Sequence, residues 1–370
     1  MSRAIAAPPL PPRPARPPEI MVRRPSVTIK HVAADAGVSL QTVSRVINKE
    51  PNVRPQMAER VQASIDRLGY VPSISAQRMR GSRSYLILAL NDRERTLADW
   101  RERQGADWVD QMMLGGMSKC AEHGYRLIVE LVDTHSDHVE RELSAALAAL
   151  RPDGVILTPP HSENPVILAM LEAAHIRVAR IGSLKPGPGF ALTMDDERAA
   201  GLATDHLIEL GHRAIGFIAG PAAYELSQWR IKGWQHAMQA AGLATDSFAR
   251  GDFGYESGIA AAEALLDGPL MPSAIIASSD RMALATLEVA RRRDLRVPED
   301  LSVISFDDTP IVRFTHPPLT AVVQPIAEVS ARAVERIIAG DGSDGEADRQ
   351  PEAIPASLAV RSSTAPPRRA

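Results

Sequence analysis

The sequence contains very little cysteine and no long hydrophobic run. Cys120 is the only cysteine among 370 residues, so the chain can form neither an internal disulfide nor a zinc site built from several cysteines. No stretch of about 18 consecutive apolar residues occurs, which argues against a membrane-spanning helix. The N-terminus also lacks the apolar segment of a secretory signal. We therefore expect a cytoplasmic protein with no membrane partner.

The sequence also lacks the short motifs that accompany common catalytic chemistry. It has no Walker phosphate-binding loop, no GxSxG turn, no HExxH motif and no GxGxxG loop after a predicted strand. Its ten histidines are scattered without the spacing of metal ligands. The acidic cluster Asp195, Asp196 and Glu197 is best interpreted as favourable charge at a helix N-terminus. We expect no enzymatic activity, no cofactor and no bound metal.

What the chain does have is an uneven distribution of charge. Residues 1–83 hold 14 Lys and Arg against 5 Asp and Glu, whereas the remaining residues hold 28 against 40. A basic N-terminal part on an acidic body indicates a polyanionic partner for the N-terminal part alone. Nucleic acid and an anionic membrane surface both fit this pattern.

The first residues of the chain form a leader rich in proline and arginine. Residues 1–25 contain eight prolines and five arginines and almost nothing that a core would bury. Such a segment cannot offset the entropy lost on ordering. We expect residues 1–26 to be disordered.

Three short helices are predicted after the leader, at Ile29–Ala36, Leu40–Ile47 and Pro55–Leu68. Thr28 and Ser39 are suitable N-caps, and Pro55 suits the first turn of a helix. Gly37 and Gly69 end the helices before them, because glycine readily adopts the left-handed conformation.

The first two helices have the pattern of a helix-turn-helix. Small Ala33 lets the helices approach, Gly37 makes the turn and Val43 fills the angle between them. This motif lies in the basic part of the chain, where a DNA-binding element is expected. We assign residues 27–71 to a DNA-binding domain.

The second of these helices would lie in the major groove of DNA. Gln41 can pair with adenine, Arg45 with guanine, and Leu40 can offer apolar contact to a thymine methyl group. Short polar side chains nearby suit phosphate oxygens and would set the register on the duplex. The predicted contacts in this domain are Thr28, Ser39, Leu40, Gln41, Thr42, Ser44, Arg45 and Asn48.

Residues 72–83 form a hinge helix or linker between the basic part and the body. Met79 is apolar and stands among arginines, including Arg78. One interpretation is an apolar wedge that enters the minor groove and unstacks a base step. The other is a flexible basic tether.

The body alternates apolar runs with amphipathic segments, which predicts parallel βαβ units in two α/β sub-domains. The predicted strands are Leu86–Leu90, Leu127–Leu131, Gly154–Leu157, Val178–Ile181, Ala214–Ala219, Ala274–Ala277 and Leu301–Phe306. The predicted helices are Val109–His123, His138–Ala149, Asn164–His175, Glu197–Leu210, Arg230–Ala241, Gly254–Leu266, Arg281–Arg293 and Ile326–Ala339. Ligands of such sheets bind in a crevice beyond the carboxyl ends of the strands.

Several motifs, in this order and spacing, resemble the LacI/GalR family of bacterial transcription regulators over residues 27–364. They are TIKHVAADAGVSLQTVSRVIN, GYVPSISAQRMRG, LATDHLIELGHRAIGFIAGP, ASSDRMALATL, VPEDLSVISFDDTP, PPLTAVVQP and LAVRSST. The resemblance implies a homodimer on a pseudo-palindromic operator. It also implies a body at 84–365 like a periplasmic sugar-binding protein, with two parallel-sheet sub-domains joined by three crossovers.

The resemblance further implies roles for individual residues. Leu40, Gln41 and Arg45 fall on operator-reading positions, where the family commonly has an aromatic residue in place of Leu40. Met79 falls where the family has an apolar lever at the operator centre. The implied effector contacts are Trp108, Arg230, Phe253, Ser279, Asp307 and Gln324.

Two features bear on how this chain differs from the family. The charged segment Asn91–Ala106 replaces a shorter loop, and it either shapes the mouth of the cleft or extends into solvent. No leucine heptads follow Gly340, so a dimer is expected and not a tetramer.

We therefore predict a transcription regulator, a repressor of carbohydrate-utilisation genes that a sugar or glycoside releases from double-stranded operator DNA. One alternative is a regulator that needs a purine-like co-repressor. Another is a soluble sugar-binding protein or a sugar-acting enzyme whose helical domain is an accessory. A membrane-surface role is disfavoured, because the apolar faces of residues 28–68 are already assigned to a small core.

Overall fold

The computed structural model describes residues 27–47, 50–70, 83–101, 107–133, 138–340 and 350–368. The chain divides into two compact units, residues 1–81 and residues 82–370. Within the described ranges, no helix is long and apolar enough to cross a membrane. The predicted leader, Asn48, Arg78, Met79 and nearly all of the predicted hinge lie outside the described residues.

The described part of the first unit contains three helices with the bounds that the sequence predicts: α1 (Ile29–Ala36), α2 (Leu40–Ile47) and α3 (Pro55–Leu68). The backbone N–H of Thr42 donates to Oγ of Ser39 over 3.1 Å, which caps α2. Gly37 follows α1 with a φ of +63°, as the turn requires. The core of this first unit is a small cluster of buried side chains, Val32, Ala33, Ala36, Val43 and Val61.

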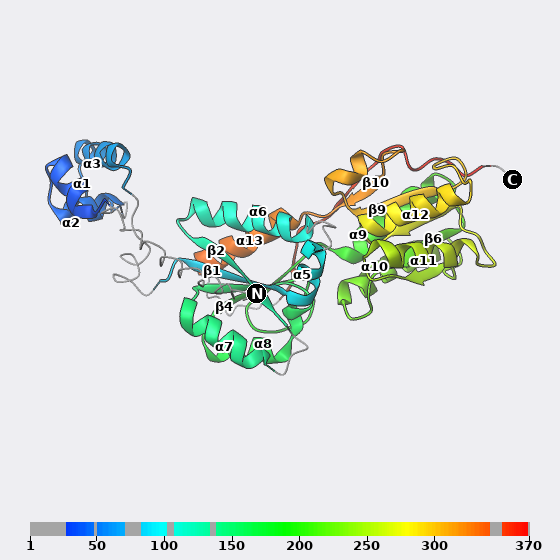
Figure 1. Cartoon of the computed structure of the whole chain (residues 1–370), viewed down its shortest axis with the longest axis horizontal. Helices are drawn as coiled ribbons and strands as arrows, with labels where there is room; N and C mark the ends of the chain where they lie inside the picture. The colour runs from blue at the N-terminus through cyan, green and yellow to red at the C-terminus, as the bar shows by residue number, and fades with distance from the viewer. Residues whose placement is uncertain are drawn as a thin grey trace, which may run out of the picture. The chain divides into compact units, whose positions relative to one another are not determined.

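The second unit consists of two α/β sub-domains, each built on its own six-stranded sheet (Figure 1). In the first sub-domain the strand order is β11-β5-β4-β3-β1-β2, and all pairs are parallel. Its strands are β1 (Leu86–Asp92), β2 (Arg126–Val132), β3 (Gly154–Leu157), β4 (Arg177–Ile181), β5 (Phe190–Thr193) and β11 (Glu352–Ala353).

In the second sub-domain the strand order is β12-β10-β9-β8-β6-β7. Only β12 runs antiparallel to its neighbour, β10. Its strands are β6 (Ile215–Ala219), β7 (Phe248–Arg250), β8 (Ala274–Ala277), β9 (Ser302–Asp307), β10 (Thr320–Val323) and β12 (Ser357–Ala359). The predicted fold class, a helical domain followed by two parallel-sheet sub-domains, is confirmed.

Helices cover both faces of each sheet, so each sheet lies between two apolar cores (Figure 1). In the first sub-domain α6 (Asp107–Glu122) and α13 (Ile326–Ala339) cover one face, and α7 (Val139–Leu150) and α8 (Pro165–Ala173) cover the other. In the second sub-domain the pairs are α9 (Asp196–Glu209) with α10 (Glu225–Ala240), and α11 (Tyr255–Leu266) with α12 (Asp280–Arg292). Two short 3₁₀ helices, His161–Glu163 and Pro310–Arg313, complete the body.

The chain passes between the sub-domains three times: between β5 and α9, between β10 and α13, and between β11 and β12. The described residues within 83–193 and 326–353 therefore form the first sub-domain, and residues 196–323 and 357–368 form the second.

The structure differs from the sequence prediction in three places. The segment expected to be a long loop contains a helix, α5 (Arg93–Arg101). Five short strands, β5, β7, β10, β11 and β12, were not predicted; segments of two to four residues carry little periodicity, although the sequence did predict β3 and β8, which have four residues each. Helix α10 begins at Glu225, before the predicted start at Arg230. Arg230 therefore lies inside the helix, and its side chain is buried.

Candidate functional site

A cavity of about 450 Å³ lies between the two sub-domains of the body. The carboxyl ends of strands from both sheets reach it, as expected for parallel α/β folds. Asp92 ends β1 and Thr158 follows β3 in the first sub-domain, whereas Ser278 follows β8 and Asp307 ends β9 in the second. The volume falls in the range of small-molecule sites, roughly 300–1,000 Å³.

All six residues that the sequence nominates for effector contact line this one cavity. They come from elements that are far apart in the chain and from both sub-domains. They are Trp108, Arg230, Phe253, Ser279, Asp307 and Gln324.

Arg230 is held by three acceptors in the cavity wall. Its Nε donates to Oδ1 of Asp196 over 2.8 Å and its Nη1 to the carbonyl oxygen of Ser278 over 2.8 Å. Its Nη2 donates to Oε1 of Gln324 over 3.2 Å. The guanidinium also lies 4.5 Å from the centre of the Phe306 ring. Since three of its five N–H groups are used, the guanidinium is fixed in place and keeps two for another acceptor.

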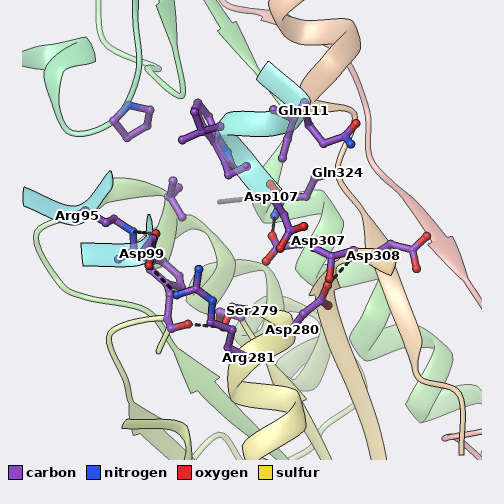
Figure 2. A pocket seen from close by; sticks show the side chains of 18 of the residues that line it. Arg95, Asp99, Asp107, Gln111, Ser279, Asp280, Arg281, Asp307, Asp308 and Gln324 are labelled. Carbon is purple, nitrogen blue, oxygen red and sulfur yellow. Dashed lines mark hydrogen bonds and ion pairs between the residues drawn. The ribbon is translucent and has the colours of Figure 1, made fainter. Parts of the chain in front are cut away.

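Gln324 and two aspartates extend this network along the cavity (Figure 2). Nε2 of Gln324 donates to Oδ1 of Asp307. Burial raises the pKa of the Asp307 carboxyl group. Burial and the neighbouring Asp307 together raise the pKa of Asp280 to about 8. The two carboxyl groups therefore resist being ionised at the same time, as expected for like charges in a shielded site.

Phe253 presents its ring at the cavity in a strained backbone conformation, with a φ of +70°. Glycine is needed at position 220, because a Cβ there would lie 2.0 Å from Cζ of Phe253. The edge of the ring meets Tyr224 at a centroid distance of 5.9 Å. The guanidinium of Arg95 lies 5.1 Å from the centre of the Phe253 ring. The aromatic side chain is thus held from three sides.

Ser279 and Trp108 line the cavity in different ways. Oγ of Ser279 donates to the carbonyl oxygen of Phe253 over 3.0 Å and accepts from the N–H of Met282 over 3.2 Å. The Ser279 hydroxyl group is therefore engaged in capping α12 and in fixing Phe253. Trp108 lies in the first turn of α6 and is half-buried against the core of the first sub-domain.

Sequence reasoning missed several charged residues of the cavity, chiefly on α5 and at the start of α12 (Figure 2). It assigned Asp196 only to helix N-terminal charge, whereas this aspartate also holds Arg230. Asp280 directly follows Ser279, and that adjacency was the one available signal for it. The missed residues that matter below are Arg95, Asp99, Asp107, Asp196, Asp280 and Arg281.

The second helix of the helical domain displays the residues predicted to read DNA. Gln41 and Arg45 are exposed, and 43% of the Leu40 surface is accessible to solvent. Arg45 lies 3.6 Å from Glu50, a weak pairing that leaves the guanidinium accessible. The hydroxyl groups of Ser39 and Thr42 are 2.9 Å apart, so they partly satisfy each other.

Comparisons with known proteins agree with this architecture. Residues 28–73 match the family model of bacterial regulatory proteins of the lacI family, and residues 204–364 match that of the periplasmic binding protein-like domain. The chain is 33% identical over 325 residues to the HTH-type transcriptional regulator CelR of Thermobifida fusca, covering 86% of this chain and 92% of that protein.

Two solved structures are also similar to this chain. A CelR–cellobiose complex has a TM-score of 0.66 and 31% identity, and the match covers 92% of this chain and all of that one. The lac repressor dimer bound to operator and the anti-inducer ONPF has a TM-score of 0.72 and 27% identity over the same shares. The relatives are transcription regulators and not enzymes, in agreement with the sequence prediction.

The chain thus has a helix-turn-helix and a body of two sub-domains, and it is 33% identical to a relative over 92% of that relative's length. This chain belongs to the LacI family of bacterial regulatory proteins and is a DNA-binding regulator of transcription.

Proposed function

We propose that this protein is a cytoplasmic repressor of carbohydrate-utilisation genes that a sugar or glycoside releases from its operator. The proposal rests on one observation above all. Six residues nominated from the sequence, from both sub-domains, line a single cavity between them. The structural similarity to a CelR–cellobiose complex supports a carbohydrate as the ligand.

The charges in the cavity favour an uncharged ligand over an anionic one. Arg230 is paired with Asp196, Arg313 with Asp308, and both Arg281 and Arg95 with Asp99. Four lining carboxyl groups, those of Asp92, Asp107, Asp280 and Asp307, have no arginine at ion-pair distance in the described part of the chain. A phosphorylated sugar would therefore meet carboxyl groups, and arginines that already have a carboxylate partner, which costs free energy.

The remaining groups suit a neutral, hydroxyl-rich molecule. Trp108 and Phe253 provide apolar faces for a sugar ring, while Asp307 and Gln324 provide acceptors and a donor for its hydroxyl groups. Arg230 would add its two remaining N–H groups. In this proposal the effector contacts are Trp108, Arg230, Phe253, Ser279, Asp307 and Gln324.

Ligand binding would act on DNA through the angle between the sub-domains. A ligand that touches both sub-domains has different affinities for an open and a closed arrangement, so it shifts the balance between them. In a homodimer this shift changes how the two helical domains engage the half-sites of a pseudo-palindromic operator. The structural similarity to an operator-bound lac repressor dimer supports this arrangement.

The proposal assigns residues 27–71 to the DNA-binding domain, residues 72–83 to a hinge and residues 84–365 to the ligand-binding, dimerising body. The major-groove contacts are Leu40, Gln41 and Arg45, and the minor-groove residues of the hinge are Arg78 and Met79. The contacts that set the register on the phosphates are Thr28, Ser39, Thr42, Ser44 and Asn48.

The ligand class is tested by isothermal titration calorimetry of the full chain against cellobiose, glucose, ribose, glucose 6-phosphate, guanine and hypoxanthine. We expect at least one neutral sugar to bind and glucose 6-phosphate to bind at least tenfold more weakly than glucose. Binding of guanine or hypoxanthine alone would contradict the proposal and favour a co-repressor.

The site is tested with two matched aspartate variants. Asp307→Ala should abolish binding of the sugar, because it removes an acceptor from the cavity. Asp246→Ala changes an exposed aspartate outside the cavity and should bind as the unmodified protein does. Sugar binding that survives in Asp307→Ala would place the ligand elsewhere.

A further inference from the structure

Helix α5 is fixed firmly to the first sub-domain. The side chain of Arg93, at its first residue, donates to the carbonyl oxygen of Leu131 from Nε over 3.1 Å and from Nη2 over 2.8 Å. The same guanidinium lies 2.6 Å from Oε2 of Glu142. Oδ1 of Asp92 accepts from the N–H of Arg95 over 2.9 Å, in the manner of a helix cap. The start of α5 therefore moves with the first sub-domain.

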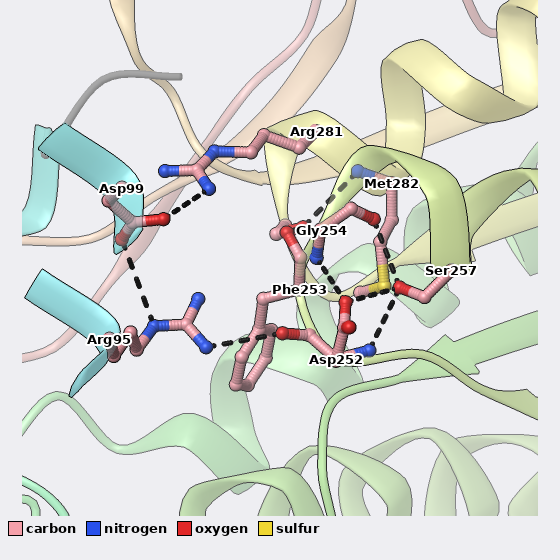
Figure 3. A network of polar contacts seen from close by, with 9 residues as sticks. Arg95, Asp99, Asp252, Phe253, Gly254, Ser257, Arg281 and Met282 are labelled. Atoms are coloured by element: carbon pink, nitrogen blue, oxygen red, sulfur yellow. Dashed lines mark hydrogen bonds and ion pairs between the residues drawn. The ribbon is translucent and has the colours of Figure 1, made fainter. Parts of the chain in front are cut away.

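The other side of α5 contacts the second sub-domain at the mouth of the cavity (Figure 3). Oδ1 of Asp99 lies 2.7 Å from Nη1 of Arg281. Nη1 of Arg95 donates to the carbonyl oxygen of Asp252 over 3.2 Å, and its guanidinium lies over the ring of Phe253. One helix thus spans from one sub-domain to the other.

The contact points on the second sub-domain are themselves rigid. Oδ1 of Asp252 accepts from the N–H of Gly254 over 2.7 Å, and the N–H of Asp252 donates to Oγ of Ser257 over 3.0 Å (Figure 3). Arg281 lies in the first turn of α12, two residues after the cap residue Ser279. Helix α5 therefore contacts residues that are well fixed in the second sub-domain, and not a loose loop.

The pairing of Asp99 with Arg281 is well placed to resist opening. Their side chains are only 19% and 21% exposed, so water and salt screen the pair less than a surface pair. A second bridge between the sub-domains, from Lys185 to Glu225, has exposures of 60% and 42% and is screened more strongly. The stronger restraint is therefore the one on α5.

We propose that α5 is a clasp that holds the two sub-domains together across the mouth of the cavity when no ligand is bound. A ligand enters through an arrangement in which the pair between Asp99 and Arg281 is broken. The population of that open arrangement then limits the apparent affinity. The inference rests on the proposed function only in treating this cavity as the ligand site.

The clasp is tested without any ligand or DNA, by measuring the distance between the sub-domains. Spin labels are attached at Glu172→Cys on α8 and Ala264→Cys on α11, two exposed positions in different sub-domains. Cys120 is buried and does not compete for the label. Co-expression with an excess of chain that lacks both introduced cysteines leaves most dimers with one labelled protomer. The measured distances then lie within that protomer. Double electron–electron resonance then gives the distance distribution.

We expect a single narrow distribution for the parent protein. Asp99→Asn and Arg281→Gln should each shift it to longer distances and broaden it. A parent-like distribution in both variants would overturn the proposal.

A matched control uses an ion pair within one sub-domain. Nη1 of Arg293 lies 2.8 Å from Oδ1 of Asp267, and both residues belong to the second sub-domain. Asp267→Ala combined with Arg293→Ala should leave the distribution unchanged, and an equal shift there would also overturn the proposal. Because the measurement uses neither sugar nor operator, failure of the proposed function leaves its outcome unaffected.

Discussion

Arg230 and Asp196 form a buried ion pair in the wall of the cavity, with Nε of the arginine 2.8 Å from Oδ1 of the aspartate. Their side chains are only 4% and 2% exposed. The pair joins α10 to the first turn of α9, and Arg230 continues through Gln324 to Asp307. Asp196 begins α9 just after the crossover from β5. Through Arg230 it thus helps to orient Gln324 and Asp307 at the cavity.

Removing Asp196 should destabilise the protein strongly. In Asp196→Ala the guanidinium of Arg230 stays buried without its carboxylate, a change that costs about 3–5 kcal/mol in comparable buried pairs. Urea denaturation followed by circular dichroism measures the loss. The control Glu288→Ala removes a carboxylate that pairs with Arg291 and Arg292 on the surface, and it should change the midpoint little. Equal midpoints for both variants would contradict this account.

The free energy of unfolding should depend on pH through Asp280. Its pKa is about 8 in the folded protein against an ordinary value near 3.8, so the folded state keeps a proton that the unfolded state releases. Stability should therefore fall as pH rises from about 4 to about 8, by at most about 1.4 kcal/mol per pH unit from this group, and level off above. Denaturation series at several pH values measure the free energy of unfolding of the parent and of Asp280→Asn. The fall expected for the parent should be absent from the variant. Parallel curves would show that Asp280 is ionised in the folded state.

Arg45 should contribute to sequence preference and not only to affinity. Arg45→Ala should cost about 1–3 kcal/mol on the preferred operator, because a bidentate contact to guanine is lost. Binding titrations on the operator and on variants of each base pair measure this, and preference should relax at one position in each half-site. An even loss across all sequences would instead indicate a phosphate contact.

The thiol of Cys120 should be inert in the folded protein. It is buried, and burial raises its pKa to about 12, so almost no thiolate is present at neutral pH. A chromogenic disulfide reagent should report no reactive thiol until denaturant is added, and one thereafter. Ala264→Cys provides an exposed thiol as the control and should react at once. Rapid reaction of the parent protein would show that this core opens readily.

Local signals in the sequence predicted the helical domain to the residue, because Ser39, Gly37, Pro55 and Gly69 mark where helices begin and end. Apolar runs likewise predicted seven strands of the body, including all those of five residues or more. Helix α5 could not be predicted, because it is charged on all sides and its stabilising partners lie elsewhere in the chain.

The candidate site was predictable only in part and for a similar reason. The resemblance to the family nominated the six cavity residues, but it carries no information on contacts specific to this chain. Arg95 meets Asp252 across 157 positions and Arg281 meets Asp99 across 182. Likewise, a position in the first turn of a helix was a sufficient reason for an aspartate at 196 in the sequence. Its pairing with Arg230 follows only from the fold.

The central claim is that the chain binds a specific operator and that a sugar releases it. Selection of bound sequences from a random DNA library with the full chain, repeated in the presence of each sugar, tests this most directly. The account predicts an enriched motif with two-fold symmetry whose binding is lost with one neutral sugar. Enrichment that requires an added ligand would contradict release by the sugar, and no enrichment under any condition would contradict the claim as a whole.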